Sequence, residues 1–182
     1  MTATNSLKIF VFVGSIWALV MGFIGPFFIV HIEKLSGGME KLGIAFSIMI
    51  LVQSATTYFA GRFSDRLGRK PFMILTGFVN AITIFLYSIV KSSSQLYLLQ
   101  ALLGITNGVA ATVNSSFLGD LTVKEKRGRV IGSVNATIGL ASAAGVTLSG
   151  FFVKYYGLKN LFYFASLCVG LSTFLLFFVK ED

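Results

Sequence analysis

Six long stretches without a charged side chain divide the sequence. Each is 20 to 28 residues long, and the charged residues lie in the short gaps between them or near the ends of the chain. A helix needs roughly 20 apolar residues to cross the hydrocarbon core of a bilayer, and peptide groups in lipid must form hydrogen bonds within their own segment. We therefore predict an all-α membrane protein, a single bundle over residues 1–182, whose six transmembrane helices cover about residues 9–30, 42–60, 71–90, 95–118, 130–153 and 160–179.

The composition excludes most other classes. Charged residues make up 12% of the chain, whereas about a quarter of the residues of a soluble domain are charged. The single cysteine rules out an intramolecular disulfide and a metal site built from several cysteines. The chain has one histidine, and all of its acidic residues lie outside the six predicted spans, which leaves little material for catalysis. We therefore expect neither an enzyme nor a bound metal or cofactor.

The lysines and arginines are distributed unevenly between the two sides of the predicted bundle. Five of them lie in the first, third and fifth gaps, and the other ten lie on the opposite side, at Lys8, Arg62, Arg66, Arg69, Lys70, Lys124, Lys126, Arg127, Arg129 and Lys180. Because cytoplasmic loops carry the excess of basic residues, we predict a multi-pass protein of the cell membrane with both termini in the cytoplasm. The net charge of +8 is assigned to anionic lipid headgroups of the bilayer rather than to nucleic acid.

The turn between the second and third predicted helices, GRFSDRLGRK, concentrates five charges within ten residues. Gly68 can adopt a positive φ, which lets the chain reverse direction within a few residues. Gly61 lacks a side chain, so another helix can approach closely where the second helix ends. Asp65 adds nothing to retention of the turn in the cytoplasm. We therefore expect it to contact a nearby arginine or the N-terminal end of a neighbouring helix.

This turn resembles the loop 2–3 motif of the major facilitator superfamily of secondary transporters. The motif positions are Gly61, Asp65, Arg66, Gly68, Arg69 and Lys70. EKRGRVIG, residues 125–132, resembles the helix 4–5 loop of the family, and YGLKNLFYF, residues 156–164, resembles its link into helix 6. Gln100 departs from the pattern, because many proton-coupled members have an arginine four residues before the glycine that corresponds to Gly104.

The resemblance implies a fold and a function. The full fold of the family has twelve helices in two halves, each a three-plus-three inverted repeat, and this sequence resembles the N-terminal half. The resemblance implies that such a half moves a small molecule, with efflux as the candidate direction, through alternating access with a second six-helix half from the same or a different chain. The sequence leaves open whether it is a fragment or a half-size protein. A non-transporting assembly or regulatory subunit with the same half-fold is the alternative.

An internal repeat supports this interpretation. Aligning GRFSDRLGRK on GFFVKYYGLK at an offset of 89 residues matches Gly61 with Gly150 and Gly68 with Gly157. The offset equals one three-helix unit and places the two turns on opposite sides of the membrane.

Two groups of residues are candidates for function. The resemblance implies that Asp65 latches the cytoplasmic side through basic residues of the neighbouring loop, here Arg127 and Arg129, with Arg66 and Arg69 available locally. Polar residues within the spans are costly in lipid unless they face protein or water. The candidates for a substrate cavity are Gln53, Asn107, Asn114 and Asn135. Hydrogen bonding between helices is the alternative role for these four residues.

Three further features receive a structural interpretation. Trp17, within the first span, is expected to be packed or to face lipid rather than to line the cavity. Gly104-x-x-x-Gly108 and the GLASAAG run, residues 139–145, are expected to be seams where helices pack closely.

Overall fold

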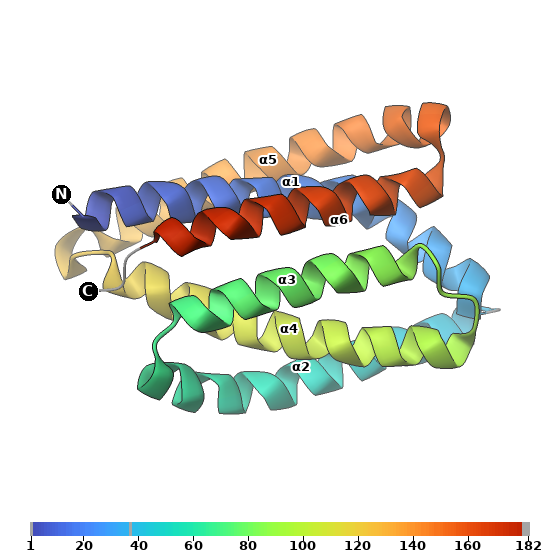
Figure 1. Cartoon of the computed structure of the whole chain (residues 1–182), viewed down its shortest axis with the longest axis horizontal. Coiled ribbons are helices and arrows are strands. Elements are labelled where there is room, and N and C mark those ends of the chain that lie inside the picture. Colours follow the sequence, from blue (N-terminus) through green and yellow to red (C-terminus); the bar gives the residue numbers. More distant parts are fainter. Residues whose placement is uncertain (1, 37, 180–182) are drawn as a thin grey trace.

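A computed structural model describes residues 2–36 and 38–179 as a bundle of long helices (Figure 1). The long helices are α1 (Thr2–Ser36), α2 (Met39–Leu67), α3 (Lys70–Tyr87), α4 (Ser93–Asp120), α5 (Arg127–Tyr156) and α6 (Leu158–Phe174). Two short 3₁₀ helices, η1 (Lys124–Lys126) and η2 (Leu175–Phe178), precede α5 and follow α6. Within the described residues, six helical segments are long and apolar enough to cross a membrane. The prediction of an all-α protein with six spans is confirmed.

The helix ends lie at two opposite ends of the bundle. The proximal end, as we call it, holds the start of α1, the α2–α3 and α4–α5 connections and η2 (Figure 1). The distal end holds the other three connections. Several helices extend beyond the uncharged stretches, since α1 has 35 residues and α5 has 30. Lys180, one of the cations assigned to the cytoplasmic side, lies outside the described residues.

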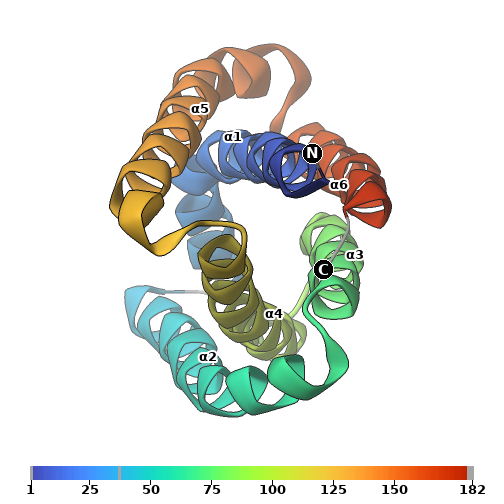
Figure 2. The same ribbon diagram turned by 90° about the vertical axis from the view of Figure 1, so that its left-hand side faces the viewer.

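The helices pack as two related sets of three. α1 packs mainly on α5, α2 mainly on α4, and α3 mainly on α6 (Figure 2). In the two sets, α1, α2 and α3 correspond to α4, α5 and α6. The α2–α4 contact then corresponds to the α5–α1 contact, and the α3–α4 contact corresponds to the α6–α1 contact. This arrangement is the predicted inverted repeat.

Backbone geometry shows the same symmetry. Gly68 ends α2 with φ 83° and ψ 163°, and Gly157, 89 residues later, ends α5 with φ 78° and ψ 162°. These values lie in a region that favours glycine. Ala81 and Gly170 are also 89 residues apart, and a Cβ placed on Gly170 would lie 3.7 Å from that of Ala81. Equivalent positions of the two repeats are therefore in contact where α3 crosses α6.

Glycines allow the two largest helix contacts to be close. A Cβ on Gly108 would lie 2.7 Å from the carbonyl oxygen of Gln53, so α4 packs directly on the backbone of α2. On the other side of the bundle, a Cβ on Gly145 of α5 would overlap the carbonyl oxygen of Leu19 in α1. Gly139, in the same predicted seam, has nothing within 4 Å of an added Cβ. The seam in α5 is therefore restricted to its distal part.

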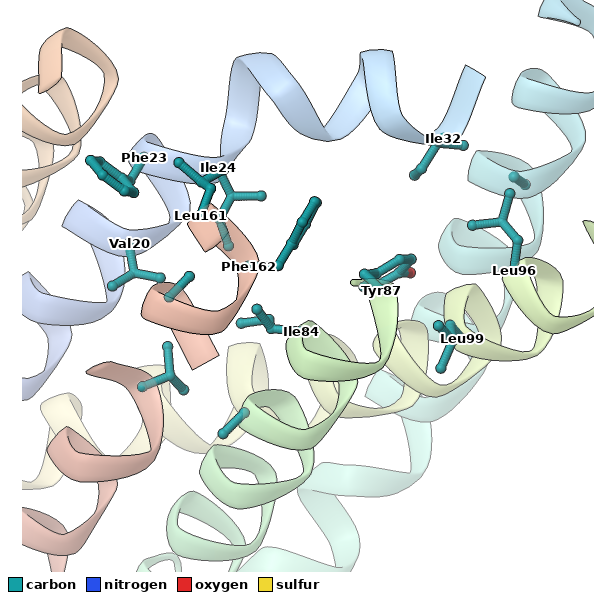
Figure 3. Packing of buried hydrophobic residues seen from close by; sticks show 14 residues of the cluster. Val20, Phe23, Ile24, Ile32, Ile84, Tyr87, Leu96, Leu99, Leu161 and Phe162 are labelled. Carbon is teal, nitrogen blue, oxygen red and sulfur yellow. The ribbon is translucent and has the colours of Figure 1, made fainter. Parts of the chain in front are cut away.

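A hydrophobic cluster fills the distal half of the bundle (Figure 3). It joins α1, α3, α4 and α6 through side chains that include Val20, Tyr87, Leu96 and Phe162. His31 reinforces it, because its Nε2 donates a hydrogen bond to the carbonyl oxygen of Tyr87 at 2.7 Å and its ring packs against Phe162. The distal half is therefore closed by dense packing, and a second apolar cluster, which includes Val113 and Phe117, lies in the proximal half.

Candidate functional site

A cluster of charges joins three helix ends at the proximal end. Arg69, in the α2–α3 turn, forms an ion pair with Asp120, the last residue of α4, and its Nη2 lies 3.5 Å from Oδ1 of Asp65 in α2. The arginine side chain is 18% exposed, whereas those of Asp65 and Asp120 are 65% and 61% exposed. The guanidinium is therefore the largely enclosed centre of the cluster, and the two carboxylates face outward.

Helix polarity explains why both acids need this cation. Asp65 lies in the last turn of α2 and Asp120 ends α4, so each carboxylate lies at the negative end of a helix dipole. Arg69 compensates both helix ends at once. The expected arginine contact of Asp65 is thus made locally, by a residue of its own motif.

Other motif residues shape the turn in different ways. Lys70 donates a hydrogen bond from Nζ to the carbonyl oxygen of Phe177 at 2.7 Å, which ties the start of α3 to η2. Arg66 is exposed. An added Cβ on Gly61 would lie 3.6 Å from the Thr112 side chain, which is ordinary van der Waals contact. Close approach of α4 therefore does not require a glycine at this position.

The two arginines expected to pair with Asp65 lie elsewhere. Arg127 donates hydrogen bonds from Nη2 to the carbonyl oxygens of Gly119 and Thr122, at 3.0 and 3.5 Å, and so fastens the start of α5 to the end of α4. Arg129 lines a groove between α1 and α5. Among the residues that the structure describes, Asp65 forms no ion pair with either of them. Sequence reasoning missed Asp120, although an acid at the end of an apolar helix was a usable signal.

A cavity of about 330 Å³ opens in the proximal half of the bundle. Side chains of α1, α3, α4, α5 and η2 line it, and α1 contributes the largest share of the wall. Two of the four predicted cavity residues, Asn114 of α4 and Asn135 of α5, lie in this wall, together with Thr76 and Ser115. The lining contains no aspartate, glutamate, lysine, arginine or histidine. The cavity therefore offers hydrogen bonds and apolar surface but no formal charge.

The other two predicted cavity residues are placed differently. Gln53 lies at the α2–α4 contact, where its backbone approaches Gly104 and Gly108. Asn107 is half-buried on α4, one heptad from Asn114, and is not part of the lining. Gln53 therefore lies at a helix–helix contact and outside the cavity lining.

The apolar wall was largely missed by sequence reasoning. Trp17, which was expected to be packed or to face lipid, lines the cavity, as do Phe10, Met21 and Met73. Phe10, Trp17 and Met21 recur at intervals of seven and four residues, so they share one face of α1. That spacing was available in the sequence, but α1 is apolar on all sides, so no contrast singled out this face.

Buried polar groups mark the interior of α4. Thr106 donates a hydrogen bond to the Oδ1 atom of Asn80 in α3 at 2.7 Å, which joins the two helices. Gln100, one turn before Gly104, is 0% exposed, and both of its amide atoms lack a hydrogen-bond partner among the residues that the structure describes. In lipid-embedded helices such a residue is uncommon and costly.

Comparison with known proteins gives a consistent result. A family model described as Major Facilitator Superfamily matches residues 9–182. The chain is 29% identical over 175 residues to the multidrug resistance protein MdtG of Proteus mirabilis, covering 93% of the chain and 42% of that protein. It is also 29% identical to the multi-drug resistance efflux pump PmrA homolog of Lactococcus lactis, covering 94% of the chain and again 42% of the relative.

The relatives differ in length. The chain spans about two fifths of the two efflux proteins. The uncharacterized MFS-type transporter YitZ of Bacillus subtilis is different, because a match of 24% identity over 147 residues covers 81% of the chain and 90% of YitZ. Proteins of this type are thus found at about the length of the present chain as well as at more than twice that length.

Proposed function

The chain belongs to the major facilitator superfamily of membrane transporters, and we propose that it forms one six-helix half of a secondary transporter for a neutral or amphipathic small molecule. The observation that carries this proposal is the cavity in the proximal half of the bundle. Its volume of about 330 Å³ lies within the range of small-molecule sites. The names of two relatives, a multidrug resistance protein and an efflux pump, support efflux as the direction.

The cavity lining supports the proposed substrate class. Trp17, Phe10 and Met21 present aromatic and polarizable surface, while Asn114 and Asn135 supply amide donors and acceptors. A fully charged substrate would lose its hydration here without gaining an opposite charge from this half, which is unfavourable. A molecule with a broad apolar surface and a few hydrogen-bonding groups is the best match.

A second six-helix half completes the proposed transporter. Alternating access in this fold requires two halves that rock around a central site. The exposed apolar surfaces of α2 and α5 support such an association. Only 6% of the apolar 18-residue stretch of α2, and 11% of that of α5, is buried within the bundle. The second half belongs to the same chain, to a second copy or to another protein.

The charge cluster is proposed to act as a latch on the cytoplasmic side. It lies at the proximal end, where nine cations of the predicted cytoplasmic set are found within the described residues. By the positive-inside rule this end faces the cytoplasm. The exposed carboxylates of Asp65 and Asp120 leave acceptor positions open to a group of the second half, which would stabilise a cytoplasm-closed state.

Fluorescence of Trp17 provides a direct test of the cavity. It is the only tryptophan of the chain, and it lies in the cavity wall, so its emission reports occupancy without a label. The purified chain is titrated with ligands matched in size that are neutral, cationic or anionic. We expect a saturable change with neutral or weakly polar amphipathic ligands. A response to none of them, or a preference for the anionic ones, contradicts the proposal.

Two asparagines of α4 give a matched pair of variants for this titration. Asn114→Leu removes a hydrogen-bonding group from the wall, and loss of one hydrogen bond lowers affinity about two- to tenfold. Asn107→Leu makes the same chemical change one heptad away, outside the lining. Equal effects of the two variants would show that the response does not originate in this cavity.

A further inference from the structure

A second hollow, a groove of about 450 Å³, lies between α1 and α5 at the proximal end. Its apolar walls come from Leu7 and Val11 of α1 and from Val130 and Val134 of α5. Lys126 and Arg129 lie at the end of the groove where α5 begins. The groove shares only Val134 with the central cavity. It is therefore a separate feature with a cationic end and an apolar body.

The groove is lined by two cations and by no acidic residue, since Glu125, the acid of η1, is not part of the lining. Both are exposed, and within residues 2–36 and 38–179 neither forms an ion pair. The first turn of α5 contains no acidic residue, and the side chain of its N-cap residue, Lys126, forms no capping hydrogen bond. Peptide N–H groups at such a start favour an anion. Two full positive charges and a partial one thus converge at the same end of the groove.

The chemistry of the groove identifies its ligand. We propose that this groove binds one anionic phospholipid, with the phosphate between Lys126 and Arg129 and an acyl chain along Leu7, Val11 and Val130. The cationic end lies where the α5 span begins, and the apolar body runs along the span, as headgroup and acyl chain do in a bilayer leaflet. An inorganic anion would leave the apolar walls unused, and a zwitterionic lipid would leave the cations partly unpaired.

Lipid retention in native mass spectrometry tests this proposal. The purified chain in detergent is titrated with phosphatidylglycerol or with phosphatidylcholine of the same acyl chains. We expect one phosphatidylglycerol molecule to be retained at least tenfold more tightly than phosphatidylcholine. Each cation near an anionic headgroup contributes roughly fivefold. The double variant Lys126→Gln/Arg129→Gln should therefore lose about 30-fold in affinity for phosphatidylglycerol.

Three comparisons separate the groove from general surface attraction. Arg62→Gln/Lys124→Gln removes two exposed cations that do not line the groove, and we expect less than a threefold loss. Ser133→Phe fills the groove while every charge is kept, and we expect it to abolish the preference. The proposal is overturned if the control double variant loses as much affinity for phosphatidylglycerol as the Lys126/Arg129 double variant. It is also overturned if Ser133→Phe keeps the full preference for phosphatidylglycerol, or if equimolar inorganic phosphate displaces the lipid. Melting temperatures in lipid-free detergent confirm that each variant is folded.

Discussion

Arg69 forms an ion pair with Asp120, and the same guanidinium lies 3.5 Å from the carboxylate of Asp65. One cation in the α2–α3 turn therefore joins the ends of α2 and α4 to the start of α3. Arg127 adds a second link, because it donates to the carbonyl oxygen of Gly119 at the end of α4. The proximal end thus has links between loops and helix ends in addition to an apolar cluster that includes Val113 and Phe117.

The Arg69–Asp120 pair is expected to contribute modestly to stability. Because Asp120 is 61% exposed, solvent screens the pair, and we expect a coupling of about 0.5–1 kcal/mol. A double-mutant cycle of Arg69→Gln and Asp120→Asn, measured by unfolding in detergent, gives this value. Glu125→Gln is the control, since Glu125 is an exposed acid of η1. A coupling of zero, or one equal to that between Arg69 and Glu125, would refute the pairing.

Gly145→Ala is expected to destabilise the bundle by about 1–3 kcal/mol, which is typical of overpacking. The added methyl group would overlap the carbonyl oxygen of Leu19 in α1, and a backbone atom cannot move aside without shifting its helix. Gly139→Ala is the matched control in the same helix. Its added Cβ meets nothing within 4 Å, and alanine is the better helix former by roughly 1 kcal/mol. A Gly145→Ala protein that melts at or above the parent temperature would contradict the close α1–α5 contact.

Gln100→Leu is expected to leave stability unchanged or to raise it, by up to about 1–3 kcal/mol. Within the described part of the chain both amide atoms of Gln100 are buried without a partner, so the substitution mainly removes a desolvation cost. Asn80→Leu provides the contrast, because it removes the Thr106–Asn80 hydrogen bond that joins α4 to α3. Since Nδ2 of Asn80 is itself buried without a partner among the described residues, we expect Asn80→Leu to be less favourable than Gln100→Leu by about the value of that one hydrogen bond, roughly 1 kcal/mol. The measurement is the thermal midpoint of each variant in the same detergent. A clear loss with Gln100→Leu would mean that the amide interacts with another group in the membrane.

Single cysteines at Lys124 and Lys159 test the proposed orientation. Both residues are exposed, and they lie in the α4–α5 connection and at the start of α6, hence at opposite ends of the bundle. In a Cys168→Ser background, a membrane-impermeant thiol reagent added to intact cells should label the Lys159→Cys protein only. The Lys124→Cys protein should label after the membrane is opened. Labelling of both from outside would contradict the topology, and the reverse pattern would invert it.

The six spans could be predicted because exclusion of charge from hydrocarbon acts on each segment independently. The Gly68/Gly157 repeat was also visible, since an unusual backbone conformation required glycine at both positions. The pairing of Arg69 with Asp120 could not be read in the same way. It depends on where the end of α4 lies relative to the α2–α3 turn, and no local pattern specifies that distance.

The cavity was harder to predict than the fold. Polar residues within spans serve both packing and ligand contact, so Asn114 and Gln53 look alike in sequence although only Asn114 lies in the cavity wall. Trp17 lies in the wall as well, on a helix whose apolar faces are indistinguishable by composition. The choice of face follows from packing against α5, where Gly145 lets α1 approach.

Flux of the ligand identified by Trp17 fluorescence is the most direct measure of the central claim, that this chain is half of a transporter. Membrane vesicles from the source cells, with and without the chain, are compared at equal protein amounts. We expect flux only with the chain, and we expect Asp65→Asn to lower it severalfold while ligand binding at Trp17 stays unchanged, because the latch acts on the conformational equilibrium and not on the cavity. Flux that is the same in vesicles with and without the chain would contradict the account.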